Sequence, residues 1–278
     1  MTKLHFFKTI NQLAHNDAVP FLVGLKNYIG WQMIRIMKQY PVEMRLSRSK
    51  IITERHNGVA ALVKVFGMYD YNNMSLIQTL LTFFPDMVFV DVGANIGTYT
   101  VIAAETGAKV WAFEPHPLTF ANLQKNVALN ALDQVNCFNY AVSNSGGTVH
   151  FSDFAQSALN RIDENGVLSV ICTTLDQMCE DRKFDKCIVK IDVEGNDFLV
   201  LQGFEKYFGC ADVFFIETDQ SPEIQQWMNT RGYQGPYYFH KNQDVLTVYP
   251  TRRKEDGIFF SEAFIQQLAE KKYHVPSL

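Results

Sequence analysis

The sequence predicts an α/β protein with a doubly wound parallel sheet and a helical extension in front of it. Short continuous apolar runs, such as 87–92 and 187–191, alternate with amphipathic segments of helical length. This alternation is typical of parallel strands that helices cover on both faces. Residues 1–60 lack the turn residues that would separate strands, so helices are expected there.

The first half of the sheet pattern lies between residues 87 and 174. Strands are expected at 87–92, 109–115 and 135–142, and helices at 99–107 and 116–132. Gly107 suits a helix end, and Pro117 suits a first helical turn. The stretches 146–151 and 169–174 indicate an inserted hairpin.

The later elements continue the alternation. They are a short helix, a strand, a longer helix, a further strand and a closing antiparallel pair, at 174–181, 187–195, 197–208, 211–218, and 237–240 with 245–250. Ligands are expected at the carboxyl ends of the strands in such a sheet. The chain therefore divides into an N-terminal helical extension (1–60), a ligand-binding domain (61–250) and a C-terminal helical tail (251–278).

Composition excludes several classes of protein. Hydrophobic residues make up 47% of the 278 residues and charged residues 19%, which suits a packed core and not a mainly disordered chain. The net charge of −4 gives no general attraction to nucleic acid. Five cysteines without a C-x-x-C pair argue against a zinc site and a disulfide framework. Together with the lack of a signal-peptide pattern, they favour the cytoplasm.

One apolar stretch, residues 18–37, is a candidate for contact with another surface. Lys26 and Arg35 interrupt it, so it falls short of the about 18 apolar residues that a membrane-spanning helix needs. We expect an amphipathic helix that docks within the protein or on a twin subunit, with a membrane surface as the alternative. A homodimer formed through the N-terminal helices would be one such arrangement.

The stretch FVDVGANIGTYT, residues 89–100, predicts a nucleotide-like ligand at a strand–helix junction. Gly93 can adopt backbone angles closed to other residues, and Gly97 allows the next helix to start close to a ligand. Backbone amides at a helix start favour a carboxylate or a phosphate. The pattern is D-x-G-x-N-x-G, with Asn95 in the middle, and not the G-x-G-x-x-G of dinucleotide-binding proteins.

Two acidic residues narrow the choice of ligand. Asp91 would repel a pyrophosphate and attract a sulfonium or an amino group, which suits the methionyl end of S-adenosylmethionine. Glu114 ends the second strand, 17 residues after Gly97, where a carboxylate can accept hydrogen bonds from ribose hydroxyls. Glu114 thus indicates an adenosine-like ligand, and Asp91 favours S-adenosylmethionine over a nicotinamide coenzyme.

Five motifs resemble those of FkbM-type methyltransferases in order and rough spacing. They are FVDVGANIGTYT, AFEPHP, NYAVSNSGG, TTLDQM and VKIDVEGND, and the resemblance covers roughly residues 60–250. It implies the Rossmann-like class I methyltransferase fold and S-adenosylmethionine as coenzyme. Many members of that family act on hydroxyl groups of sugars or polyketides, so the implied activity is O-methylation of a sugar, a glycan or another small molecule.

The resemblance also implies a set of coenzyme-binding residues. These are Gly93, Ala94, Asn95 and Gly97 for the methionyl part, Glu114 for the ribose, Ala141 and Val142 for the adenine, and Asp192 for the methyl-transfer centre. Pro115 is a further coenzyme-binding candidate. The chain departs from the family after DVEG. A small or apolar residue and then Glu often follow there, whereas this chain has Asn196 and Asp197.

An alcohol must lose a proton when it is methylated, so a base near the coenzyme is expected. The candidates at strand ends are Asp192, Glu194, Glu217 and His240. Asp192 or Glu194 could instead orient the acceptor or hold a divalent cation, although nothing in the spacing demands a metal. Glu194 could also cap the following helix, and His240 could be an ordinary surface or core histidine.

Three other functions remain as alternatives. A nicotinamide-dependent oxidoreductase would need a different glycine pattern from the one in this chain. A non-catalytic scaffold that binds S-adenosylmethionine would keep the loop without turnover. Methylation of nucleic acid is disfavoured by the acidic balance and by the lack of an Asn/Asp-Pro-Pro-Tyr/Phe motif after the fourth strand.

Overall fold

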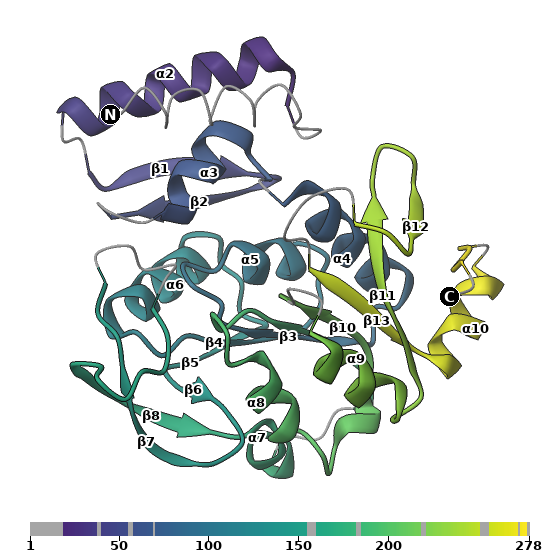
Figure 1. Ribbon diagram of the computed structural model, residues 1–278. Helices are drawn as coiled ribbons and strands as arrows, with labels where there is room; N and C mark the ends of the chain where they lie inside the picture. The colour runs from purple at the N-terminus through teal and green to yellow at the C-terminus, as the bar shows by residue number, and fades with distance from the viewer. Residues whose placement is uncertain are drawn as a thin grey trace.

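The computed structural model contains a large twisted sheet between two layers of helices, with a smaller N-terminal unit on one side (Figure 1). It describes residues 19–37, 40–54, 58–68, 70–154, 160–181, 185–217, 221–250, 256–271 and 273–276. The helical prediction for residues 1–18 lies outside these residues.

The central sheet has eight strands in the order β12-β11-β13-β10-β9-β3-β4-β5. Their bounds are β3 (Val88–Val92), β4 (Val110–Phe113), β5 (Val135–Phe138), β9 (Cys187–Ile191), β10 (Ala211–Ile216), β11 (Tyr233–His240), β12 (Val245–Thr247) and β13 (Gly257–Ser261). The five strands from β10 to β5 are parallel, and β13 runs antiparallel to both of its neighbours. The predicted doubly wound fold of class I methyltransferases is confirmed.

Apolar side chains on both faces of the strands hold the helices in place. One face packs against α4 (Tyr71–Phe83), α5 (Thr98–Ala104), α6 (Pro117–Leu129) and α10 (Glu262–Glu270). The other face packs against α7 (Leu175–Asp181), α8 (Asp197–Gln202) and α9 (Pro222–Asn229). Every residue of β3 and β9 is buried, as expected for central strands covered on both sides.

The predicted third strand, 135–142, is divided between two sheets. Its first part is β5, and its last part, β6 (Ala141–Val142), joins a small sheet with β7 (Gly147–Phe151) and β8 (Leu168–Thr173). The amide of Asn139 donates to the carbonyls of Glu114 and Pro115, which holds the chain across the end of β4. β7 and β8 are antiparallel, so the predicted inserted hairpin is confirmed.

The prediction of helices throughout residues 1–60 is wrong for residues 42–53. The helix α2 (Phe21–Met37) is followed by a hairpin of β1 (Val42–Leu46) and β2 (Ser49–Thr53), and then by α3 (Gly58–Phe66). Alternate residues of β1 are buried, which is the period of a half-covered strand. The hairpin lies over α5 and α6, where the buried Asn126 accepts from the amide of Ile52 at 2.6 Å and donates to the carbonyl of Ile96 at 2.8 Å.

The C-terminal tail, predicted as helical, instead begins with an interior strand. Residues Ile258, Phe259 and Phe260 of β13 are fully buried between β10 and β11, and α10 follows directly. The helical prediction is therefore wrong for residues 257–261, because this apolar run is covered on both faces. The tail is part of the main sheet and not an appendage. Among the described helices, none is both long and apolar enough to cross a bilayer.

Candidate active site

A pocket opens where the parallel strands β3, β4 and β9 end. Together with the space where it opens to solvent, it has a volume of about 810 Å³. Nine of the residues predicted for the site line it: Gly93, Ala94, Asn95, Glu114, Pro115, Ala141, Val142, Asp192 and Glu194. The sequence thus placed most of the candidate residues in one cavity, although their individual roles stay predictions.

The glycine loop lies directly against the end of β9. Gly93 has a φ of +85°, and a Cβ atom there would lie 1.9 Å from the carbonyl oxygen of Asp192. Gly97 has a φ of +87° and precedes α5, but it does not line the pocket. A Cβ at Gly97 would lie 2.6 Å from Cδ1 of Leu123, so this glycine allows close packing against α6. Gly97 thus serves packing between α5 and α6, and its predicted approach to a ligand stays a prediction.

Asp91 lies beneath the loop and not in the pocket lining, contrary to the prediction that it faces the ligand. Its Oδ2 accepts from the hydroxyl of Thr100 at 2.6 Å, which ties β3 to α5. No hydrogen bond of the described structure reaches its Oδ1, and burial raises the pKa of this carboxyl. Asp91 points to the α5 side of the sheet because side chains alternate along a strand, and Phe89 points the same way.

Glu114 lies in the pocket wall and holds the loop in shape. Its two oxygens accept from the backbone amides of Asn95, at 3.0 Å, and His116, at 2.9 Å. Burial raises the pKa of Glu114 to about 7, against the opposing effect of these two bonds. Carboxylate oxygens have further lone pairs, so Glu114 can still accept from the hydroxyls of a ligand.

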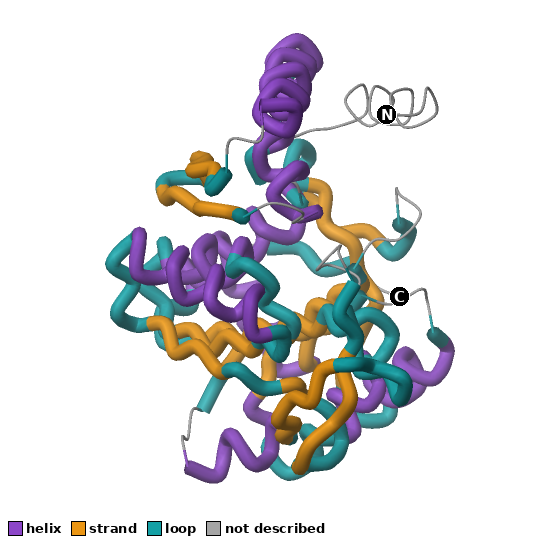
Figure 2. Tube along the Cα trace, turned by 90° about the vertical axis from the view of Figure 1, so that its left-hand side faces the viewer, coloured by secondary structure: helices purple, strands orange, loops and turns teal. Residues whose placement is uncertain are grey.

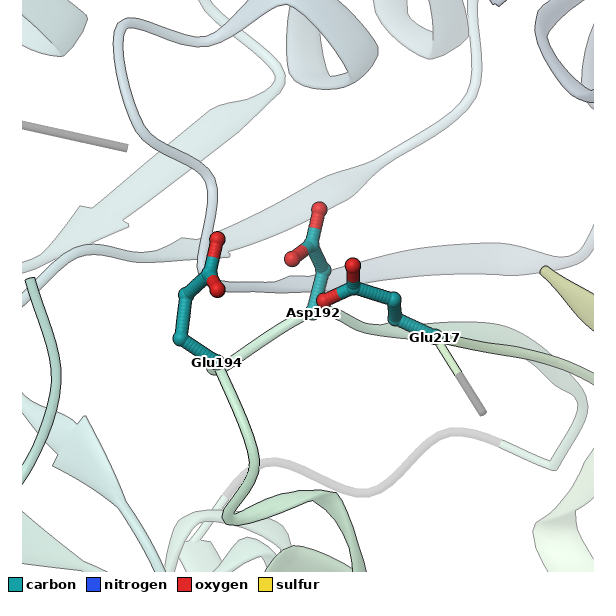
Figure 3. Close-up of side chains that lie close together, drawn as sticks. All are labelled: Asp192, Glu194 and Glu217. Atoms are coloured by element: carbon teal, nitrogen blue, oxygen red, sulfur yellow. The ribbon is translucent and has the colours of Figure 1, made fainter. Parts of the chain in front are cut away.

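Three carboxyl groups meet at the ends of β9 and β10. Figure 3 shows Asp192, Glu194 and Glu217 with their oxygens turned toward one another, and one oxygen from each lies within 4.8 Å of the others. Glu217 does not line the pocket. Glu194 follows Asp192 in the turn before α8, with a φ of +53°. Three of the four candidate bases therefore lie together, and which of them acts as the base stays a prediction.

Lys190 and Glu217 lower the pKa of Asp192 and so favour its ionised form. Burial opposes ionisation of Asp192, but the ammonium of Lys190 lies 2.8 Å from its Oδ2 and holds the pKa of Asp192 below its ordinary value. Lys190 is itself only 2% exposed and lies over the ring of Tyr99. Burial, followed by the charges of Asp192 and Glu194, raises the pKa of Glu217 to about 8. The site thus favours the ionised form of Asp192 and the protonated form of Glu217.

His240 lies apart from this group, contrary to its prediction as a base. It is on β11, whose separation from β10 by β13 places it two strand spacings, about 10 Å, along the sheet. Its Nε2 lies 3.0 Å from the hydroxyl of Thr247 on β12, and it does not line the pocket. This position fits the alternative of an ordinary surface or core histidine.

Comparison with known proteins decides the family. The model of the methyltransferase FkbM domain matches residues 91–235, which is more than half of the chain. The protein belongs to the FkbM methyltransferase family. The matched region begins in β3 and ends within β11, so it contains the glycine loop, Glu114 and the carboxyl groups of β9 and β10.

Curated relatives of this FkbM protein are methyltransferases. One is hexuronic acid methyltransferase AglP of Haloferax volcanii, which is 33% identical over 48% of this chain and 56% of its own length. Another is methyltransferase sdnD of Sordaria araneosa, 33% identical over 52% of this chain and 72% of its own. The chain thus spans little more than half of AglP. Among solved structures, an S-adenosylmethionine-dependent methyltransferase of Agrobacterium tumefaciens is 8% identical, with a TM-score of 0.44 over 80% of this chain and 69% of that one.

Several residues of the FkbM site were not found from the sequence. The pocket is also lined by Val59, Tyr99, Tyr140, Phe151, Asn160, Ile162 and Lys190. Asp256, just before β13, lies close enough to the site to raise the pKa of Glu217. Burial and the charge of Asp70 raise the pKa of Asp256 itself to about 8. An apolar run after residue 256 was the available signal, but it was assigned to a helical tail.

The three carboxyl groups are also a suitable oxygen set for a divalent cation. Lys190 already binds one oxygen of Asp192, and the proton of Glu217 would have to leave before that group could act as a ligand. Asp197, at the start of α8, has a structural role, because its Oδ1 accepts from the backbone amide of Val193. This bond closes the turn that carries Glu194.

Proposed function

We propose that this FkbM protein transfers a methyl group from S-adenosylmethionine to a hydroxyl group of a neutral sugar, glycan or other small molecule. The observation that carries the proposal is the single pocket wall in which the glycine loop, Glu114 and the ionised Asp192 lie together. The family model and the two relatives support methyl transfer as the reaction class.

The pocket offers suitable partners for each part of the coenzyme. Backbone groups of Gly93 to Asn95 would meet the methionyl part, and Glu114 would accept from the ribose. Ala141 and Val142 are buried and apolar, and they would cover the adenine. When bound, S-adenosylmethionine supplies a methyl group on a positively charged sulfur.

Asp192 would take the proton of the acceptor hydroxyl. Lys190 binds its Oδ2, and the side chain is 38% exposed, so the carboxylate can still accept from a hydroxyl group in the pocket. A carboxylate with a low pKa is a weak base, so proton transfer would follow the making of the new bond and not precede it. The protonated Glu217, which shares a hydrogen bond with Asp192, would share the negative charge in the resting site.

Charge in the pocket favours a neutral acceptor. Lys190 is the one Lys or Arg among the lining residues that the structure describes, and it is bonded to Asp192. Glu114, Asp192 and Glu194 are all acidic, so a carboxylate on the acceptor would meet repulsion. The hexuronic acid in the name of AglP is therefore not extended to this chain.

Thermal unfolding with S-adenosylhomocysteine and with NAD tests the coenzyme. A ligand at 100 times its dissociation constant adds about 2.7 kcal/mol to the free energy of unfolding, or about 5–10 °C in Tm for a chain of this size. We expect this shift with S-adenosylhomocysteine alone. Glu114→Gln should weaken its binding about tenfold or more, because an amide replaces a charged acceptor. A shift with NAD alone would reject the proposal in favour of an oxidoreductase.

Turnover separates an enzyme from a binding scaffold. We expect methylated products from a panel of neutral glycosides and polyols, and little from the matching uronic acids. Asp192→Asn keeps the size of the side chain and should lower turnover about 100-fold or more while coenzyme affinity is retained. Coenzyme binding without turnover on any hydroxyl compound would instead support the scaffold.

A further inference from the structure

The outward face of α2 is apolar and exposed, although α2 is already packed on its other side. Gly24, Tyr28 and Trp31 are buried, and α2 makes its main contacts with α3. The opposite side carries five exposed apolar residues, which we call the α2 outer face: Leu22, Ile29, Met33, Ile36 and Met37. The exposed fraction of Leu22 is 75% and that of Ile36 is 79%. Five such residues on one side of a helix indicate an interaction surface.

The shape around this helix is convex. In Figure 1 α2 forms the outermost layer of the N-terminal unit, above the hairpin and α3. Figure 2, turned by 90°, again shows this helix projecting from the body of the protein. A projecting helix is suited to contact with a broad surface.

The charge of this part of the chain indicates what kind of surface the α2 outer face would contact. Residues 1–66 contain ten Lys and Arg against three Asp and Glu, a net charge of +7, whereas the whole chain has −4. The helix α2 has no acidic residue, and Lys26 lies among the apolar residues of the outer face. Such an asymmetry favours a partner of negative charge.

A second copy of this chain is a poor partner for the α2 outer face. A symmetric contact would bring two units of +7 together, and like charges at an interface are unfavourable. An anionic bilayer offers both complements, since its headgroups attract Lys and Arg and its acyl boundary accepts apolar side chains. Lys26 can extend its ammonium to the headgroups while its methylenes stay in the apolar layer.

We infer that α2 binds anionic lipid bilayers as an interfacial helix, with the α2 outer face in the membrane. Binding at this place would hold the pocket close to the lipid surface. α2 packs on α3, and Val59 of α3 lines the pocket. The inference rests on surface residues only and does not depend on the proposed methyl transfer.

Sedimentation with two kinds of vesicle tests the inference. One kind contains phosphatidylcholine alone, and the other also contains anionic phosphatidylglycerol. The full chain should sediment with the anionic vesicles and be released by salt. The double variant Met33→Ser, Ile36→Ser should bind at least tenfold less, because burial of each apolar side chain favours the bound state. Lys26→Glu should reduce binding about fivefold or more.

A matched control uses exposed apolar residues elsewhere. Leu118 on α6 and Val167 beside β8 are 74% and 80% exposed. The double variant Leu118→Ser, Val167→Ser should bind vesicles like the wild type. All variants should keep the Tm shift with S-adenosylhomocysteine, so that loss of lipid binding is distinguished from loss of the coenzyme site.

Three results would overturn the inference. The first is no sedimentation of the wild type with anionic vesicles. The second is equal binding by the α2 variants and the wild type. The third is a dimer in analytical ultracentrifugation that Met33→Ser, Ile36→Ser dissociates, without vesicle binding, which would assign the α2 outer face to a second copy.

Discussion

A Cβ atom added at Gly93 would separate the glycine loop from the end of β9. It would lie 1.9 Å from the carbonyl oxygen of Asp192, whereas real Cβ atoms stay about 3.0 Å away. The obstacle is backbone, so the loop and the strand must move apart by about 1 Å. Overpacking of this kind costs about 1–3 kcal/mol. The positive φ of +85° adds about 1–2 kcal/mol for any L-residue with a side chain.

Gly107 provides a matched control for Gly93→Ala. Its φ is +92°, but a Cβ there would meet nothing within 4 Å. Gly107→Ala should therefore lower stability by the backbone term alone, about 1–2 kcal/mol. Gly93→Ala should lower it by about 2–5 kcal/mol in total. Chemical denaturation of the two variants measures the difference.

Coenzyme affinity should differ more between Gly93→Ala and Gly107→Ala than the free energy of unfolding does. A displacement of about 1 Å near a reacting group can cost about 100-fold in rate, and Gly93 but not Gly107 lines the pocket. Titration calorimetry with S-adenosylhomocysteine should give wild-type affinity for Gly107→Ala and at least tenfold weaker binding for Gly93→Ala. Equal affinities would refute the assignment of this loop to the coenzyme, and equal losses of stability would refute the predicted clash with the carbonyl of Asp192.

Three further predictions concern charge and docking. The pKa of Glu217 is raised to about 8, so the folded state holds an extra proton between about pH 4.5 and 8 and loses stability as the pH rises through that window. Glu217→Gln should reduce this fall in urea denaturation at pH 5 and 8, and an unchanged slope would contradict the assignment. Lys190→Met leaves Asp192 without its cation and should cost about 2–4 kcal/mol, somewhat below a fully buried pair, because Asp192 is 38% exposed. A Tm equal to that of the wild type would count against this pair. Asn126→Ala leaves two backbone groups without their partner and should cost about 2–4 kcal/mol, with earlier proteolysis of the β1–β2 hairpin. The half-buried Asn130 is the control, and an equal loss in Asn130→Ala would argue against a special role for Asn126.

The sequence alone predicted those parts of the site whose residues follow one another directly along the chain. The glycine loop, the end of β4 at Glu114 and the end of β9 at Asp192 each combine a buried strand with the residues directly after it. Parallel strands bring such ends to one edge of the sheet, so their meeting in one pocket could be predicted without knowing the strand order.

Distant pairings were the part that the sequence did not reveal. β13 is short, and its partners β10 and β11 are recognised only once the whole sheet is known. Asp256 was missed with it. Asp91 was misplaced for another reason. Both faces of β3 are buried, so the sequence does not show toward which face each side chain points. The buried hydrogen bond to Thr100 settles its direction.

The position of β13 has a consequence for synthesis of the chain. A polypeptide leaves the ribosome from its N-terminus, yet β11 and β12 connect to the sheet only through β13, which comes later. Until residues 257–261 emerge, β10 presents an open edge rich in phenylalanine, to which foreign strands can add. A nascent chain of this protein should therefore depend on chaperones until residues 257–261 have left the ribosome.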